Sequence, residues 1–208
     1  NPVSAGMIFR WNSVSKMHTA TAILKAQEAG LLGVDDPVTA YVPELELDGY
    51  APESIQLRHL LAHTAALPDE WRTSCSNTSD DGLDSYFTNN TFTPLAQPGS
   101  FYNYSNTNWN LLGLVAERVY GLPFVDLMDE EVLEPSGMTN ASFDVHAVVD
   151  GAYAIGIDGD YSYYAPDLHD CARMRPAGWL HGSVVDLAQS MELHLANGDG
   201  LLSEETVL

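Results

Sequence analysis

The sequence of 208 residues is poor in three features: it has only two lysines, only two cysteines and no long apolar run. Its longest apolar stretches fall well short of the ~20 residues that a membrane-spanning helix needs, which argues against a membrane span. The cysteines form no Cys-x-x-Cys pair and have no histidine at metal-binding spacing, which argues against a zinc site. An apolar content of 45% argues against disorder, so we expect a substantial core.

Positive charge is also scarce. Six Arg and two Lys stand against 17 Asp and 12 Glu, which gives a formal net charge of −21, and the carboxylates are spread along the chain. Such a surface repels nucleic acid and anionic membranes, so we expect neither as a partner. We favour a dispersed, strongly hydrated surface over an acidic binding patch, because no block of like charges occurs. Neutral or cationic substrates would be tolerated more easily than polyanions.

The two cysteines are the best indication of the compartment. Cys75 lies in a polar loop, residues 73–80, which would gain stability from a cross-link. Cys171 lies far from it in the sequence, and two buried thiols are the alternative to a Cys75–Cys171 disulfide. We favour the disulfide, and with it an exported protein, periplasmic or secreted. Four Asn-x-Ser/Thr sequons are compatible with export, at Asn77, Asn89, Asn103 and Asn140.

Hydrophobic spacing predicts one domain over residues 1–208 that is rich in helices, with little material for a sheet. Residues 68–100 are polar and weakly periodic, so we expect a long surface excursion there. Residues 143–176 are rich in Gly, Asp and Tyr, and we expect a loop with short extended pieces. The predicted helices lie at about 13–30, 55–63, 84–88, 106–120, 124–132 and 183–197, with a short helix or turn at 35–38.

The most informative stretch is Ser13-Val14-Ser15-Lys16. Residues three apart share one face of a helix, so the Ser13 hydroxyl and the Lys16 amine would lie side by side. Residues 7–11 read as a short strand, which puts Ser13 at a strand-to-helix junction, where backbone N–H groups are unpaired. A serine becomes nucleophilic when a base takes its proton, and a sheltered lysine can be that base. The alternative is that Ser13 caps the helix and Lys16 is solvated.

A second polar group precedes the helix predicted at 106–120. Tyr104 and Asn106 lie on the loop into that helix, where side chains can point into a cleft. A phenol whose pKa is lowered by nearby cations can relay a proton between a serine and a leaving group. The amide of Asn106 offers a donor and an acceptor to a substrate amide. The alternative is that Tyr104 is a packing aromatic and Asn106 a helix cap.

Taken together, these residues resemble the serine β-lactamase and penicillin-binding protein superfamily, specifically its branch of class C β-lactamases, D-alanyl-D-alanine carboxypeptidases and family VIII esterases. Ser13 to Lys16 is similar to the first motif of that family, and Tyr104 to Asn106 is similar to its second. Four further landmarks occur in the family's order, so the resemblance covers most of the chain. They are residues 33–45, 57–64, 133–138 and 176–188.

The resemblance implies an α+β protein, of which this chain is the mainly helical central portion of a β-lactamase/transpeptidase-like fold with the antiparallel sheet largely missing. It implies acyl transfer through an acyl-enzyme on Ser13, with the Ser13 backbone N–H as one arm of an oxyanion hole. Lys16 would be the base or its electrostatic support, Tyr104 the proton relay and Asn106 a substrate-amide contact. No metal or organic cofactor is implied. The expected substrates are β-lactams or D-alanyl peptides.

Three alternatives stay open. An esterase of the same fold would use the same catalytic residues on simple esters. A non-hydrolytic sensor or scaffold would bind penicillin or peptidoglycan without turnover, although such a module has no need of all four site residues. A metalloenzyme is the least favoured, because His59 and His63 have the spacing of a metal-binding pair but lack the intervening glutamate of a zinc protease.

The chain departs from the family at three points. The third motif, a Lys or His followed by Thr or Ser and then Gly, is not found, and we expect it beyond residue 208. Few residues precede Ser13, although the family's first strands come before its serine, so we expect this chain to be part of a longer protein. Ala65-Ala66 stands where the family usually has Ser-Gly, which matters if that turn needs a positive φ.

Overall fold

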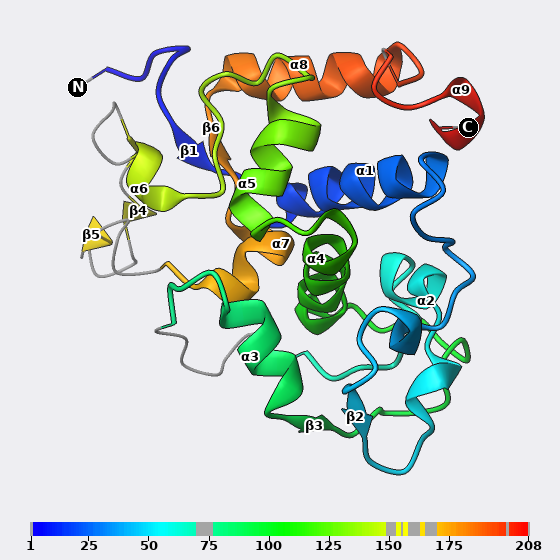
Figure 1. Ribbon diagram of the computed structural model, residues 1–208. Helices are drawn as coiled ribbons and strands as arrows, with labels where there is room; N and C mark the ends of the chain where they lie inside the picture. The colour runs from blue at the N-terminus through cyan, green and yellow to red at the C-terminus, as the bar shows by residue number, and fades with distance from the viewer. Residues whose placement is uncertain are drawn as a thin grey trace.

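The computed structural model describes residues 2–69, 77–148, 153–154, 156–157, 163–164, 170–198 and 200–207 (Figure 1). The described chain is mainly helical, as the sequence predicts. Its α-helices are α1 (Ser15–Glu28), α2 (Leu57–Leu61), α3 (Gly82–Thr88), α4 (Asn106–Tyr120), α5 (Phe124–Met128), α6 (Val145–Val148), α7 (Arg175–Gly178), α8 (Val184–Leu195) and α9 (Glu204–Val207). Shorter helical turns lie at η1 (Asn12–Val14), η2 (Val38–Ala40), η3 (Pro52–Ser54), η4 (Asp129–Leu133) and η6 (Ala172–Met174).

Strands are few and short in the described part of the chain, where they pair two at a time. The antiparallel pair β1 (Phe9–Arg10) and β6 (His181–Gly182) joins segments far apart in the sequence, with Arg10 opposite His181 (Figure 1). The other pairs are β2 (Glu46–Leu47) with β3 (Thr91–Phe92), which is parallel, and β4 (Gly156–Ile157) with β5 (Tyr163–Tyr164), which is antiparallel. The prediction of an α+β chain with most of its sheet missing is therefore confirmed.

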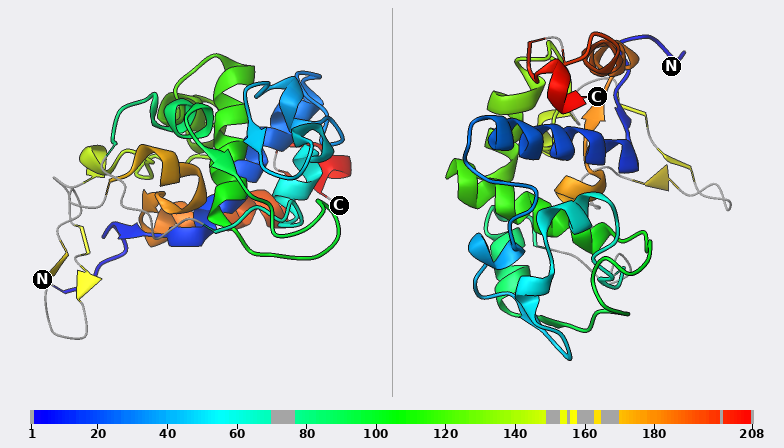
Figure 2. Two further views of the ribbon diagram at one scale, coloured as in Figure 1. Left: turned by 90° about the horizontal axis from the view of Figure 1, so that it is seen from below. Right: turned by 90° about the vertical axis from the view of Figure 1, so that its right-hand side faces the viewer.

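The centre of the molecule is α4, against which α1 and α7 pack (Figure 2). Residues 107–116 of α4 are all buried, polar and apolar alike. A helix that is buried all round must lie inside the fold rather than on its surface. On α1 the residues Ala22, Ile23 and Ala26 are fully buried in the core that α4 shares. The residue that begins α4, Asn106, is thereby held close to the start of α1.

Several helices begin and end where the sequence predicts. Gly30 follows α1 with φ +71° and Gly121 follows α4 with φ +71°, the left-handed conformation that favours glycine after a helix. Ser183 caps α8, because its Oγ accepts a hydrogen bond from the Asp186 backbone N–H at 3.3 Å. These ends depend on local backbone chemistry, so short-range sequence patterns can find them.

The predicted loop over 143–176 is wrong near both ends, because Val145–Val148 form α6 and residues 172–178 form η6 and α7. Pro176 and Gly178 make this stretch read as a loop. In the structure Pro176 lies against Gly113 of α4, and packing there overrides weak helix propensity. This correction bears on the site, since α7 supplies one of its backbone carbonyls.

The segment 68–100 is mostly exposed over residues 77–100, but it has buried anchors that we did not expect. The short helix predicted near its middle is present as α3. However, Leu83, Phe87 and Phe92 are almost completely buried and stack into the core. The hydrophobic residues of this segment are too widely spaced to reveal a period, although three of them anchor it.

Two further expectations concern Ala66 and the cysteines. Ala66 adopts φ +59°, so the Ala65-Ala66 turn does need a left-handed residue, which costs a non-glycine residue roughly 1–2 kcal/mol.

Cys171 is buried, whereas Cys75 lies outside the described residues, so their disulfide stays a prediction. None of the described helices is both long enough and apolar enough to cross a bilayer.

The contact between α4 and α7 is the basis of a first prediction. A Cβ at Gly113 would lie 2.2 Å from Cγ of Pro176, so Gly113→Ala should force α7 away from α4. We expect a loss of about 1–3 kcal/mol in the free energy of unfolding, and about 2–4 °C in Tm for each kcal/mol. Urea and thermal unfolding measure both quantities. A Cβ at Gly6 would meet nothing within 4 Å, so Gly6→Ala is the control. Equal stability of the two variants would contradict this packing.

Candidate active site

Ser13 lies on a sharp turn between a strand and a helix. The chain leaves β1 and enters η1, whose first residue, Asn12, has φ +49°, and then continues into α1. Asparagine is one of the few residues that tolerate this left-handed conformation. Ser15 fastens the turn, because its Oγ donates to Asn12 O at 2.5 Å and accepts from the Leu180 N–H at 3.0 Å. The Ser13 side chain is thereby exposed at a fixed position.

Lys16 reaches Ser13 and two other segments. Its Nζ lies 3.1 Å from Ser13 Oγ, 2.7 Å from Asn106 Oδ1 and 2.7 Å from Ala177 O. The side chain is buried, with 5% exposed. An ammonium group has three N–H donors, so these three acceptors satisfy it fully.

The same contacts determine which group the lone pair of a neutral Lys16 amine can bond to. Burial lowers the pKa of Lys16 to about 8, although the carboxylate of Asp69 acts in the opposite direction. The side-chain oxygen of Asn106 and the carbonyl of Ala177 can only accept hydrogen bonds. After loss of a proton, the lone pair of Nζ can therefore be satisfied only by the hydroxyl of Ser13. The geometry directs the basic form of Lys16 at Ser13.

Tyr104 approaches Ser13 from the loop that precedes α4. Its hydroxyl donates to Ser13 Oγ at 2.7 Å, and Nζ of Lys16 lies 5.0 Å from the centre of its ring. The ring stacks on His63, with the centres 4.3 Å apart and the planes at 26°. Ser13 Oγ therefore lies within hydrogen-bond distance of both an amine and a phenol.

His63 is a site residue that the sequence reasoning assigned to no role in the site. The Ser105 N–H points at its Nδ1 at 3.1 Å, and Nε1 of Trp109 points at its Nε2 at 2.8 Å. An imidazolium would place an N–H against both donors, whereas the neutral ring accepts from one of them. Burial and Lys16 lower the pKa of His63 to about 4. His63 is therefore neutral at physiological pH and supports the Tyr104 ring and the start of α4.

Asn106 is held by Asp69, a second residue that the sequence reasoning missed. One carboxylate oxygen of Asp69 accepts from the Asn106 backbone N–H at 3.0 Å and from its Nδ2 at 3.2 Å. This fixes the amide so that Oδ1 faces Lys16. Asn106 thus contacts the candidate base, in addition to lining the cavity beside Ser13.

A cavity of about 310 Å³ opens beside Ser13 and is the candidate substrate site. Its volume is near the lower end of the ~300–1,000 Å³ typical of small-molecule sites. Its wall comes from β1, η1, the start of α4 and the segment around α7. The lining residues are Arg10, Asn12, Ser13, Asn106, Met174, Ala177, Gly178 and Trp179.

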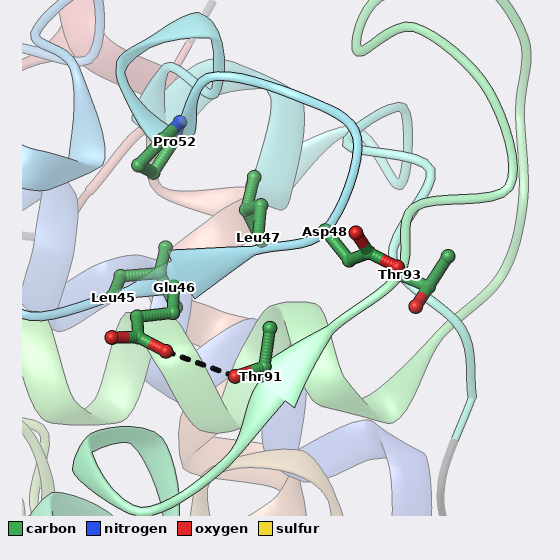
Figure 3. A pocket seen from close by; sticks show the side chains of 7 residues that line it. All are labelled: Leu45, Glu46, Leu47, Asp48, Pro52, Thr91 and Thr93. Atoms are coloured by element: carbon green, nitrogen blue, oxygen red, sulfur yellow. Dashed lines mark hydrogen bonds between the residues drawn. The ribbon is translucent and has the colours of Figure 1, made fainter.

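A larger cavity, of about 480 Å³, lies at β2 and β3 (Figure 3). It is lined by two carboxylates, Glu46 and Asp48, and by hydroxyl and apolar side chains, and Glu46 already accepts a hydrogen bond from Thr91 Oγ1 at 2.9 Å. Among the described residues that line it there is no serine, lysine, arginine or histidine, so it lacks the pairing of a serine hydroxyl with an amine that is found at Ser13. Chemistry rather than size therefore identifies the smaller cavity as the candidate active site.

His59 and His63 have separate partners. His59 contacts the backbone of Gln56 through its Nδ1, whereas His63 packs under Tyr104. In the described ranges, no three or more His, Cys, Asp or Glu side chains gather as metal ligands would. His18 is buried and bonded to Ser190 Oγ at 2.9 Å, so it packs α1 against α8 rather than facing the cavity.

Several known proteins are similar to this chain in sequence. A family model described as Beta-lactamase matches residues 1–208. Beta-lactamase of Yersinia enterocolitica is 31% identical over 160 residues, which cover 74% of this chain and 39% of that protein. Penicillin-binding protein 4* of Bacillus subtilis is 29% identical over 144 residues, covering 66% of this chain and 31% of that protein. The chain therefore spans less than half the length of these curated relatives.

Solved structures give the same result for the fold. The beta-lactamase/D-alanine carboxypeptidase from Pseudomonas syringae superimposes with a TM-score of 0.79 at 26% identity, covering 94% of this chain and 53% of that one. The octameric penicillin-binding protein homologue from Pyrococcus abyssi gives 0.82 at 25% identity, covering 99% and 49%. The resemblance predicted from the motifs is confirmed.

The buried position of Lys16 leads to a prediction about stability and pH. Because burial lowers its pKa from 10.5 to about 8, the unfolded chain binds more protons than the folded protein between these values. The cost of burying the ammonium group therefore falls as the pH rises through that window, and the free energy of unfolding rises. We expect the free energy of unfolding of the wild type, relative to Lys16→Met, to rise by at most about 1.4 kcal/mol per pH unit between pH 8 and 10.5. Urea unfolding of both proteins at several pH values measures this, and a constant difference would contradict it.

Proposed function

This chain belongs to the beta-lactamase family, and on that premise we propose that it is a serine hydrolase that transfers an acyl group through Ser13. Its fold is the helix-rich part of the α+β β-lactamase/transpeptidase-like fold. One observation carries the proposal: Ser13 Oγ lies 3.1 Å from Lys16 Nζ and 2.7 Å from the Tyr104 hydroxyl, beside a cavity.

In the proposed reaction Lys16 is the base of the acylation step. As Ser13 Oγ bonds to the substrate carbonyl carbon, its proton passes to neutral Nζ and the carbonyl π electrons move to oxygen. Tyr104 donates its proton to the leaving nitrogen or oxygen as that bond breaks, and the proton on Lys16 restores the phenol. Water then releases the acyl group by the reverse route. The Ser13 N–H is proposed as one arm of the oxyanion hole.

A second arrangement keeps Lys16 charged throughout. The ammonium would then stabilise an ionised Tyr104, and the phenolate would take the proton of Ser13. The three acceptors around Nζ suit this charged form, whereas the lowered pKa of Lys16 favours the first arrangement. The pH dependence of acylation separates the two.

We propose β-lactams or D-amino-acid peptides as substrates, ahead of simple esters. The family and the amide group of Asn106 at the cavity support this choice.

We also propose that the protein is exported, because family members are typically exported, and that it carries a Cys75–Cys171 disulfide. A shift in electrophoretic mobility on reduction, absent in Cys171→Ser, tests the disulfide.

The nucleophile is tested by active-site labelling. We expect a fluorescent penicillin or fluorophosphonate probe to label the purified protein, and the label to disappear in Ser13→Ala. Ser203→Ala is the matched control, since Ser203 is an exposed serine bonded to Glu28 at the far end of α1. Absence of label in the wild type would contradict the assignment of Ser13.

The fate of the label and the preferred substrate separate the alternatives. A label that decays with time indicates an enzyme, and a permanent label indicates a sensor. Parallel turnover of a chromogenic cephalosporin, a D-alanyl peptide and a p-nitrophenyl ester ranks the substrate classes. A marked preference for the ester would replace the proposed substrates by those of an esterase.

The proton carriers are tested by the pH dependence of acylation. If neutral Lys16 is the base, the rate of acyl-enzyme formation should rise through a pKa of about 8 and then level off. If charged Lys16 supports a phenolate, the rate should fall above that pH.

Tyr104→Phe, which keeps the ring on His63, should lower the rate of acyl-enzyme formation about 10²–10⁴-fold with little change in Tm. Stopped-flow or quenched labelling measures these rates, and an unchanged rate in Tyr104→Phe would eliminate the relay.

A further inference from the structure

A cation lies in the wall of the cavity beside Ser13. Arg10 comes from β1, three residues before the nucleophile, and it lines the same cavity of about 310 Å³ as Ser13 and Asn106. The proposed mechanism uses Lys16, Tyr104 and Asn106 and gives Arg10 no role. A guanidinium group at this position is unexpected for a chain with a formal net charge of −21 and only six arginines.

Two contacts fix the orientation of this guanidinium. Its Cζ lies 3.6 Å from the centre of the Trp179 ring, and its Nε donates to Gly178 O at 3.3 Å. Stacking on an aromatic face holds the planar group while leaving its terminal N–H groups free to form hydrogen bonds in the plane. A guanidinium group that is already oriented loses less entropy when it binds a partner.

Among the residues that the structure describes, no carboxylate forms an ion pair with Arg10. Among the described residues the ion pairs of arginine within 4.0 Å belong to Arg58, Arg118 and Arg175. Asp170 attracts Arg10 from a distance, but its carboxylate is buried and paired with Arg175 at 2.9 Å. Burial lowers the pKa of Arg10, while Tyr153 and Asp170 oppose that shift, and an arginine stays protonated at neutral pH. A half-buried, charged and oriented guanidinium group therefore belongs to the wall of the cavity.

We propose that Arg10 binds a carboxylate of the substrate, so that the site selects acyl compounds carrying one negative charge within reach of Ser13. This inference rests on the proposed acyl transfer at Ser13. The two parallel N–H groups of a guanidinium match the two oxygens of a carboxylate. The surrounding negative charge repels polyanions, so a single local cation favours a monocarboxylate over a more highly charged substrate.

The alternative is that Arg10 is a brace, that is, a purely structural residue. Its Nε bond to Gly178 O and its stacking on the Trp179 ring would then only support residues 178–179. A brace acts equally on all substrates. A carboxylate site acts only on those that carry the charge. A matched pair of esters therefore distinguishes the two roles.

The experiment compares p-nitrophenyl hydrogen glutarate with its neutral methyl ester. We expect the wild type to prefer the acid by at least about tenfold in kcat/KM, and Arg10→Gln to lower the value for the acid about 10–100-fold while changing that for the methyl ester less than about threefold. Arg58→Gln removes the same charge from an exposed arginine paired with Asp35, and it should leave both values unchanged. An equal loss for both esters in Arg10→Gln would overturn the proposal in favour of a brace.

Binding to Ser13→Ala separates this inference from the proposed function. The nitrophenyl group quenches tryptophan fluorescence, so the affinity of both esters can be measured without turnover. Tighter binding of the acid that is lost in Ser13→Ala/Arg10→Gln supports the carboxylate site, even if the wild type hydrolyses neither ester and acyl transfer is wrong. Equal binding of the two esters, or no binding of either, overturns the carboxylate site, whatever the hydrolysis rates show.

Discussion

The buried ammonium group of Lys16 connects the three segments that make up the site. Its hydrogen bonds reach η1, the first residue of α4 and the backbone of α7. Removing a charge from water is costly, so this arrangement is stable only while all three acceptors stay in place. Close packing of Gly113 against Pro176 brings α7 near enough for its carbonyl to serve as one of them. The packing of the core and the chemistry of Ser13 thus depend on the same contacts.

The first turns of α1 bury five polar side chains, and four of them, all but Thr21, bond to other parts of the fold. Ser15 bonds to the Leu180 N–H, Thr19 to Pro176 O at 2.9 Å and His18 to Ser190. These bonds fix the helix that carries Lys16 against the segment 176–190. A nucleophile and a base must be held within a fraction of an ångström of their working geometry, and such a shell of buried hydrogen bonds supplies that rigidity.

The distribution of charge also distinguishes the site from the rest of the molecule. The chain has few cations, yet Arg10 lines the cavity and Lys16 bonds to Ser13 beside it. Asp69 is close enough to raise the pKa of Lys16, against the effect of burial, and it also orients Asn106. A strongly negative molecule can therefore present a locally positive site, because nearby groups at low dielectric outweigh distant charges screened by solvent.

Local features of the sequence were sufficient for much of the framework. The positions of α1, α4 and α8 follow from apolar spacing, caps and terminal glycines, all of which act over a few residues. The family resemblance also named Ser13, Lys16, Tyr104 and Asn106, and the structure brings these four together. The missing sheet was anticipated from the scarcity of strand patterns.

The tertiary structure alone decided the rest of the site. The third acceptor of Lys16 is a backbone carbonyl 161 residues away, and a carbonyl has no signature in the sequence. The helical form of α7 arises from packing on α4, against the local preference of Pro176 and Gly178. The roles of His63, Asp69 and Arg10 depend on which side chains face them across the fold. Sequence patterns report on neighbours along the chain, whereas burial, hydrogen-bond partners and the resulting pKa values depend on neighbours in space.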